Sequence, residues 1–264
     1  MNSIRCWQVD AFTDQPFHGN PAAVYWLDSP RETRWMQAVA AEMNLSETAF
    51  VRSRGDVLEL RWFTPTMEVD LCGHATLATA HALWSDGLFR TDQPLGFQTR
   101  SGLLTCCRAG DFIELNFPAT PAKMIQPTEN LLGALGIESA LVAVSKFYLL
   151  VVVDSAETVR NLQPDFGRLI QEKTLGVIVT ALSDEPQFDF ISRFFAPAMG
   201  VNEDPVCGSA HCCLTPYWAE RLGKSNLTAY QASPRGGLLK LRLTGDRVVL
   251  AGQAVTVWKG ECYC

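Results

Sequence analysis

Two segments of the chain place a cysteine and a glycine directly before a helix-like run. They are DLCGHATLATAH at 70–81 and EDPVCGSAHCCL at 203–214. A glycine at such a junction lets the backbone approach a ligand closely, and the first N–H groups of a helix favour an anion. The pattern predicts two helix ends, at Gly73 and Gly208, that bind a carboxylate or stabilise an enolate-like transition state if they converge on one pocket.

The two cysteines of these segments, Cys72 and Cys207, hold the same place in each copy. A helix N-terminus lowers a thiol pKa, so a thiolate and a thiol on opposite faces of a substrate carbon would form a racemase pair. Cysteine is also a small apolar residue that is commonly buried, and this chain has nine of them. Both interpretations stay open from the residues alone.

Polar residues beside these turns add candidates for binding and proton transfer. They are His74 in the first copy, and Asp204 and Ser209 in the second. Because polar groups of these types accompany a duplicated Cys-Gly turn, a functional site is favoured over two ordinary buried helix starts.

Two further segments carry candidate site residues. In NLSETAF at 44–50, Glu47 lies among apolar neighbours before a strand, and an apolar setting raises a carboxyl pKa toward the range useful for proton transfer. A solvent-facing loop glutamate is the alternative. In FTDQPFHGNPAAV at 12–24, Asn20 lies in a turn that either lines the pocket or connects two strands.

A metal site is the third possibility for the cysteine segments. Cys207 with His211 and Cys72 with His74 could in principle supply four ligands. The spacing is not a double Cys-x-x-Cys, and glycine shapes the first turn for backbone contacts. We therefore expect no metal.

The elements that position these residues repeat along the chain. RWFTPTMEVDLCGHATLATAHALW at 61–84 and RFFAPAMGVNEDPVCGSAHCCLTPYW at 193–218 share Phe-x-Pro-x-Met-x-Val, then Cys-Gly-x-Ala, then a helical stretch ending in Trp. We infer two homologous halves, at 1–118 and 119–253, with the final strand near 254–264 joining the first half.

Each half has the composition of strands around a buried helix. The expected strands are 4–12, 57–63, 112–117, 147–153, 175–182, 188–195 and 248–258. The run at 75–84 is apolar on nearly every face, which predicts a helix buried on all sides. The fold class is α+β, with two pseudo-symmetric halves that each wrap a strongly curved, mostly antiparallel sheet around a central helix.

Three helix details are also expected. A helix over 29–44 would be capped by Ser29 and end at Asn44. The segment 161–173 could be its counterpart in the second half, although Pro164 interrupts it. Pro216 should kink or split the second central helix.

Composition restricts the class of protein. The chain has 264 residues, of which 47% are apolar, and its net charge is −6. Because it has no Lys/Arg run, we expect no nucleic-acid binding. The longest apolar run, near 147–154, is too short to span a bilayer, and the N-terminus lacks a signal-peptide core. We expect a cytoplasmic protein with reduced thiols and a small-molecule partner.

The motifs together resemble the PhzF family of phenazine-biosynthesis-like proteins. They are VDAFTDQPFHGNPAAV, NLSETAF, FTPTMEVDLCGHATLA and FFAPAMGVNEDPVCGSAHC, in family order and spacing. This family has the diaminopimelate epimerase-like fold, which agrees with the internal repeat. The region 119–190 carries no recognisable motif.

The resemblance implies a cofactor-independent isomerase that is often a homodimer. In the founding enzyme, one glutamate moves a proton between carbons of dihydro-3-hydroxyanthranilate, and Glu47 matches that residue. His74 and Asp204 match the family's active-site histidine and aspartate. The helix-end residues of the family correspond to Gly73, Gly208 and Ser209. Cys72 and Cys207 recreate the two-cysteine pattern of diaminopimelate epimerase and proline racemase, so the two-thiol racemase stays open, as does a non-catalytic binding protein.

Overall fold

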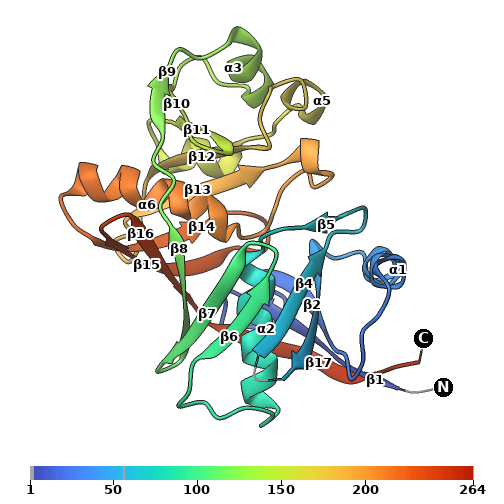
Figure 1. Cartoon of the computed structure of the whole chain (residues 1–264). Helices are drawn as coiled ribbons and strands as arrows, with labels where there is room; N and C mark the ends of the chain where they lie inside the picture. The colour runs from blue at the N-terminus through green and yellow to red at the C-terminus, as the bar shows by residue number, and fades with distance from the viewer. Residues whose placement is uncertain (1–2, 56, 264) are drawn as a thin grey trace. The chain divides into compact units, whose positions relative to one another are not determined.

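The computed structural model describes residues 3–55 and 57–263 and divides into two compact units (Figure 1). Unit 1 comprises Met1–Asn116 and Ala251–Cys264, and unit 2 comprises Phe117–Leu250. That these units correspond to two homologous domains, divided near residues 118 and 253, stays a prediction.

Unit 1 is built on a mixed sheet. Its strands are β1 (Ile4–Ala11), β2 (Asn20–Trp26), β3 (Glu47–Arg54), β4 (Val57–Phe63), β5 (Glu68–Val69), β6 (Leu95–Thr99), β7 (Gly102–Ala109), β8 (Phe112–Pro118) and β17 (Ala254–Cys262). They are ordered β17-β1-β2-β3-β4-β6-β7-β8, and β5 also pairs with β4. Only β2–β3 and β4–β6 are parallel among these pairs, so the sheet is mostly antiparallel.

Unit 2 repeats this order of pairing. Its strands are β9 (Lys123–Ile125), β10 (Leu141–Val144), β11 (Tyr148–Val152), β12 (Gly176–Leu182), β13 (Phe190–Phe195), β14 (Asn226–Gln231), β15 (Gly237–Thr244) and β16 (Arg247–Gly252). They follow one another across the sheet, with β11–β12 and β13–β14 parallel. The parallel pairs therefore recur at the same two places as in unit 1.

One long helix packs against each sheet. In unit 1, α2 (Gly73–Ser85) contacts β1, β2, β3, β7 and β17, and ten of its thirteen residues are buried. In unit 2, α6 (Gly208–Leu222) contacts β14 and β15. The all-round apolar composition of 75–84 thus corresponds to a buried central helix, and the predicted α+β fold class is confirmed.

Pro216 does not split α6, because the helix runs continuously from Gly208 to Leu222. A proline lacks the N–H that would bond the carbonyl four residues earlier, here Cys212. The backbone N–H of Thr120 donates to that carbonyl at 3.0 Å instead. A neighbouring segment therefore satisfies the group that the proline leaves unpaired.

The first helix begins later than predicted. α1 spans Thr33–Met43, its N-cap is Glu32, and Ser29 does not cap it. Residues 28–32 contain no buried side chain, so packing does not hold them helical, whereas Met36 is the first helix residue to reach the core. The predicted end is confirmed, since Asn44 adopts the left-handed C-cap conformation with φ of 50°.

Other boundaries also differ from the expectation. The single strand expected at 248–258 is two strands, β16 and β17, interrupted at Gln253. The segment 161–173 is not one helix: α4 (Ala156–Asn161) ends before Pro164, and α5 (Phe166–Leu169) begins after it. In the same motif-poor region lies α3 (Glu129–Leu135), and η1 (Pro197–Met199) follows β13.

None of the helices in the described residues combines the length and the apolar character needed to cross a bilayer.

Candidate active site

Glu47 occupies the first position of β3, directly after the turn that follows α1. The left-handed conformation of Asn44 ends α1 and redirects the chain into the strand. β2 pairs in parallel with β3, with Ala22 opposite Glu47. The Glu47 side chain is only 15% exposed, so the predicted solvent-facing alternative is wrong.

His74 lies in the first turn of α2 and points to Glu47. Cys72 is the N-cap of α2 in extended conformation, and its side chain makes no capping bond. The two functional groups approach each other at 3.4 Å, from Nε2 of His74 to Oε2 of Glu47. On the other side of the ring, Nδ1 lies 3.2 Å from the Asn20 amide nitrogen and 3.5 Å from the Cys72 sulfur. We name these four residues the Glu47 cluster: Asn20, Glu47, Cys72 and His74.

Asn20 selects the tautomer of His74. An amide nitrogen can only donate, so Nδ1 of His74 must accept, and the ring proton lies on Nε2. That proton therefore lies on the side of the ring nearest Glu47. Asn20, which is the first residue of β2 and does not lie in a turn, thus contributes to the cluster.

His74 is neutral at ordinary pH. Burial lowers the pKa of His74 to about 3. The approach to Glu47 is therefore not an ion pair, and its 3.4 Å length exceeds a normal N–H···O hydrogen bond. The Glu47 carboxyl group therefore lies beside a neutral imidazole.

Three residues of the Glu47 cluster could also hold a metal ion. Ligand atoms of Glu47, Cys72 and His74 all lie within 4.8 Å of one another, and thiolate, imidazole and carboxylate suit Zn²⁺. This set differs from the ligands considered from sequence, because it includes Glu47. In the other segment, Nδ1 of His211 donates to the Cys207 carbonyl at 2.8 Å.

Unit 2 carries a second group of polar atoms at the start of α6. Cys207 is the N-cap, Gly208 is the first helical residue, and Ser209 follows. Oγ of Ser209 lies 3.2 Å from the Cys207 sulfur and 2.8 Å from the Tyr148 hydroxyl. Burial is the main cause that raises the pKa of Tyr148, so its hydroxyl stays protonated.

Gln231 fixes the backbone of the second cysteine turn. Its amide oxygen accepts from the Cys207 N–H at 2.9 Å, and its amide nitrogen donates to the Asp204 carbonyl at 2.7 Å. Gln231 is fully buried at the end of β14, so both hydrogen bonds are made by a buried side chain. The backbone of Asp204 is thereby tied to the Cys207 turn.

Sequence reasoning missed Tyr148 and Gln231. Tyr148 is part of an apolar run that reads as a buried strand, and only its hydroxyl distinguishes it. Gln231 ends a strand with no motif around it. Nothing short of the sheet topology could connect either residue with the Cys207 turn.

The two units are not equivalent at the position of Glu47. Thr48 pairs with Phe63, and Val177 pairs with Phe195, while Phe63 and Phe195 hold the same place in the repeated motif. The counterpart of Glu47 is therefore Gly176, where a Cβ would lie 2.5 Å from the Phe194 ring. Unit 2 has neither a carboxylate nor room for one at this position.

Comparisons with known proteins agree with this fold and its motifs. The family model described as phenazine biosynthesis-like protein (PhzC-PhzF) matches residues 9–260. An uncharacterized isomerase of Halalkalibacterium halodurans is 54% identical over 99% of both chains. A crystal structure of a PhzF family protein from Enterococcus faecalis is 43% identical, covers 100% of both chains and has a TM-score of 0.95.

A more distant structure shares the fold alone. It is a predicted epimerase from Pseudomonas aeruginosa, 22% identical over 99% of both chains, with a TM-score of 0.77. The family model covers nearly the whole chain, and the relatives match from end to end. The chain belongs to the phenazine biosynthesis-like family of PhzF proteins.

Proposed function

We propose that this protein is a cofactor-independent isomerase that moves a proton between carbon atoms of a small, carboxylate-bearing substrate. Glu47 is the general acid/base. Its carboxylate takes a proton from one carbon, becomes a carboxylic acid, and returns a proton to another carbon. Substrate and product are isomers, so the reaction needs no oxidant, reductant or second substrate.

The approach of Glu47 to the neutral His74 carries this proposal. The Glu47 side chain is 15% exposed and so is partly removed from water, and it lies beside a neutral imidazole. A carboxylate in this position is suited to accept a proton from a substrate carbon, and the imidazole N–H can stabilise negative charge on either the carboxylate or the substrate. His74 therefore positions the substrate and its protons without being protonated itself.

The helix ends supply the groups that bind the substrate. The first N–H groups of α2, from Gly73 onward, have no acceptor within the helix and favour an anion. The start of α6 offers the equivalent groups from Gly208, together with the Ser209 and Tyr148 hydroxyls. We assign carboxylate and oxyanion binding to these groups, and a supporting polar role to Asp204.

The isomerase name of a close relative supports the reaction class, since that protein is 54% identical along its whole length. The counterpart of Glu47 in unit 2 is Gly176, which supports one acid/base residue rather than a symmetric pair.

A two-thiol racemase is the second candidate. Cys72 and Cys207 are both N-caps, and each is 6% exposed. In that reaction one thiolate removes the substrate proton and the other thiol returns one from the opposite face. A third candidate is a binding protein without catalysis.

Exchange of substrate protons with solvent separates an enzyme from a binding protein. The protein is incubated in deuterated buffer with a panel of amino acids and dihydroaromatic carboxylic acids, and isotope incorporation is followed by NMR. Replacement of a carbon-bound hydrogen of the substrate by deuterium supports the isomerase. Binding of panel members in a thermal-shift assay, with no exchange and no rearranged product, would support binding alone.

The remaining expectations are a small-molecule partner and a homodimer. Light scattering of the purified chain tests the second, with a mass twice that of one chain as the expected result.

A further inference from the structure

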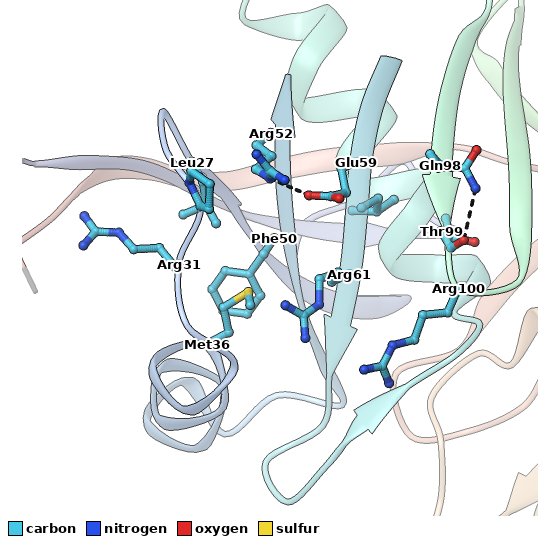
Figure 2. Close-up of a pocket in the computed structure, with 12 residues that line it drawn as sticks. Leu27, Arg31, Met36, Phe50, Arg52, Glu59, Arg61, Gln98, Thr99 and Arg100 are labelled. Atoms are coloured by element: carbon cyan, nitrogen blue, oxygen red, sulfur yellow. Dashed lines mark hydrogen bonds and ion pairs between the residues drawn. The ribbon is translucent and has the colours of Figure 1, made fainter. Parts of the chain in front are cut away.

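Unit 1 contains a groove on the sheet face that α1 covers. Its volume is about 400 Å³, and it lies among α1, β3, β4 and β6. Figure 2 shows that Phe50 and Met36 lie between Arg31 on one side and Arg61 on the other, with Arg100 beyond Arg61. We call this site the arginine groove.

The arginine groove is separate from the Glu47 cluster. Successive side chains of a strand point to opposite faces, so Phe50 and Arg52 lie on the face opposite Glu47. The cross-strand partners of these two residues, Arg61 and Glu59, share that face. The isomerase proposal does not use any of the arginines, and the groove does not depend on it.

The repeated motif shows what Arg61 lacks. Its counterpart Arg193 forms a two-bond pair with Glu203 at 2.7 and 2.8 Å, as Arg61 does with Glu68 at 2.7 Å for both bonds. Each guanidinium also lies over the ring two residues later, Phe63 or Phe195. The two arginines therefore have the same local arrangement, with one carboxylate partner and one aromatic ring.

The outer nitrogens of the two arginines differ. Nη1 of Arg193 donates to carbonyl oxygens at the end of α4, the nearest being that of Leu162 at 2.8 Å. Nη1 of Arg61 has no acceptor among residues 3–55 and 57–263, since only its Nε and Nη2 form bonds. Nη1 of Arg61 therefore lacks the kind of carbonyl contact that Nη1 of Arg193 makes. Arg61 lines the groove.

Two arginines share the Glu68 carboxylate. They are Arg61 and Arg100, whose Nη2 lies 2.6 Å away. Asp70 is the only other carboxylate near Arg100 within the described part of the chain, at 3.7 Å and 74% exposed. The Glu68 side chain is 7% exposed, so it holds both guanidinium groups in place.

A second shared carboxylate lies on the other wall of the groove. Glu59 accepts from Arg52 and lies 3.5 Å from Arg54, so two arginines again share one carboxylate. Arg31 has no carboxylate partner in the described residues and lies over the Trp35 ring. Four arginines line the groove with one carboxylate, Glu59, in a chain whose net charge is −6.

We propose that the arginine groove binds a small organic anion, a phosphate or carboxylate attached to a flat apolar group. Guanidinium groups held by carboxylates keep unused donors in fixed orientation, which suits the oxygens of a phosphate or carboxylate. The side chains of Met36 and Phe50, both 2% exposed, supply the apolar floor for the rest of the ligand. The anion oxygen takes the place at Arg61 that the carbonyl oxygens take at Arg193.

Calorimetric titration of the full chain tests this proposal. The probes are naphthyl phosphate and inorganic phosphate at low and high salt. We expect naphthyl phosphate to bind at least about tenfold tighter, because the floor removes its ring from water, and to weaken as salt rises. No binding of either probe, or equal affinity for both, would overturn the proposal.

A charge-matched pair of double variants locates the site. Arg31→Gln with Arg100→Gln removes two groove charges without taking Arg61 from Glu68, and should weaken naphthyl phosphate binding at least about tenfold. Arg90→Gln with Arg221→Gln removes two exposed charges elsewhere and should leave binding unchanged. Equal loss in both, or no loss in the first with an unchanged Tm, contradicts the assignment to this groove.

Discussion

Glu47 and Gly176 hold the same position in the two units, and only one of them carries a side chain. Glu47 directly precedes Thr48, which pairs with Phe63. Gly176 directly precedes Val177, which pairs with Phe195, the residue that matches Phe63 in the repeated motif. The crowding of Phe194 around Gly176 prevents a second carboxylate there. This asymmetry agrees with our proposal of one acid/base residue, Glu47 in unit 1.

The first prediction concerns the tautomer of His74. Asn20→Ala removes the amide that donates to Nδ1 at 3.2 Å, so the ring proton is no longer confined to Nε2. We expect kcat to fall about tenfold or more, because a misplaced imidazole proton disables an otherwise intact site. The exposed Asn226→Ala is the control. An unchanged kcat for Asn20→Ala would show that the tautomer is irrelevant.

The second prediction concerns the hydroxyl pair of unit 2. Tyr148→Phe removes the 2.8 Å bond to Ser209 and should raise KM more than it lowers kcat, because we assign these groups to binding. The lost bond should also reduce the free energy of unfolding by about 1 kcal/mol. Tyr263→Phe, at a 66% exposed residue, is the control. A large loss of kcat at constant KM would instead assign Tyr148 to the chemical step.

The repeat, the fold class and most of the candidate site follow from sequence, for a physical reason. Glu47, His74 and the cysteine turns lie in local motifs whose glycine and helix-start chemistry is readable in a few residues. Tyr148 and Gln231 reach their partners only through the sheet. Their roles depend on which strands become neighbours, and no local pattern records that.

The failed sequence predictions have the same origin. Pro216 is tolerated inside α6 because Thr120, far away in the chain, bonds the carbonyl it leaves open. Ser29 has the chemistry of a helix cap, yet α1 begins where Met36 can reach the core. The arginine groove was not predicted because its charges come from separate strands and are joined by Glu59 and Glu68.

The third prediction concerns stability at acid pH. Burial lowers the pKa of His74 to about 3 and the pKa values of His81 and His211 to about 4, from an ordinary value of 6.5. The unfolded chain therefore binds more protons below pH 6.5, so stability is full above that pH and falls as pH drops toward 4. Each histidine adds a slope approaching about 1.4 kcal/mol per pH unit in this window.

Chemical denaturation of His211→Asn between pH 7 and pH 4 measures this effect. The variant should lose stability less steeply than the parent by about one histidine's slope. Asn226→Ala, at an exposed residue that does not titrate, should leave the pH dependence unchanged. Identical slopes for the parent and His211→Asn would contradict the buried neutral histidine.

The fourth prediction concerns metal ions. Because Glu47, Cys72 and His74 can converge on Zn²⁺, added zinc should inhibit isomerisation, and a chelator should restore it. Cys72→Ser should raise the zinc concentration for half inhibition about tenfold or more, whereas Cys107→Ser should not change it. Activity that is lost with the chelator and regained with zinc would show a metal-dependent enzyme and overturn the proposed mechanism.

The most direct test compares the two candidate acid/base residues in the same assay. Once a substrate is found, kcat and solvent deuterium incorporation are measured for Glu47→Gln and for Cys207→Ser. We predict a loss of about 10²–10⁴-fold for Glu47→Gln and near-parental exchange for Cys207→Ser. Full activity in Glu47→Gln, with exchange abolished in Cys207→Ser, would contradict this prediction and establish the two-thiol reaction.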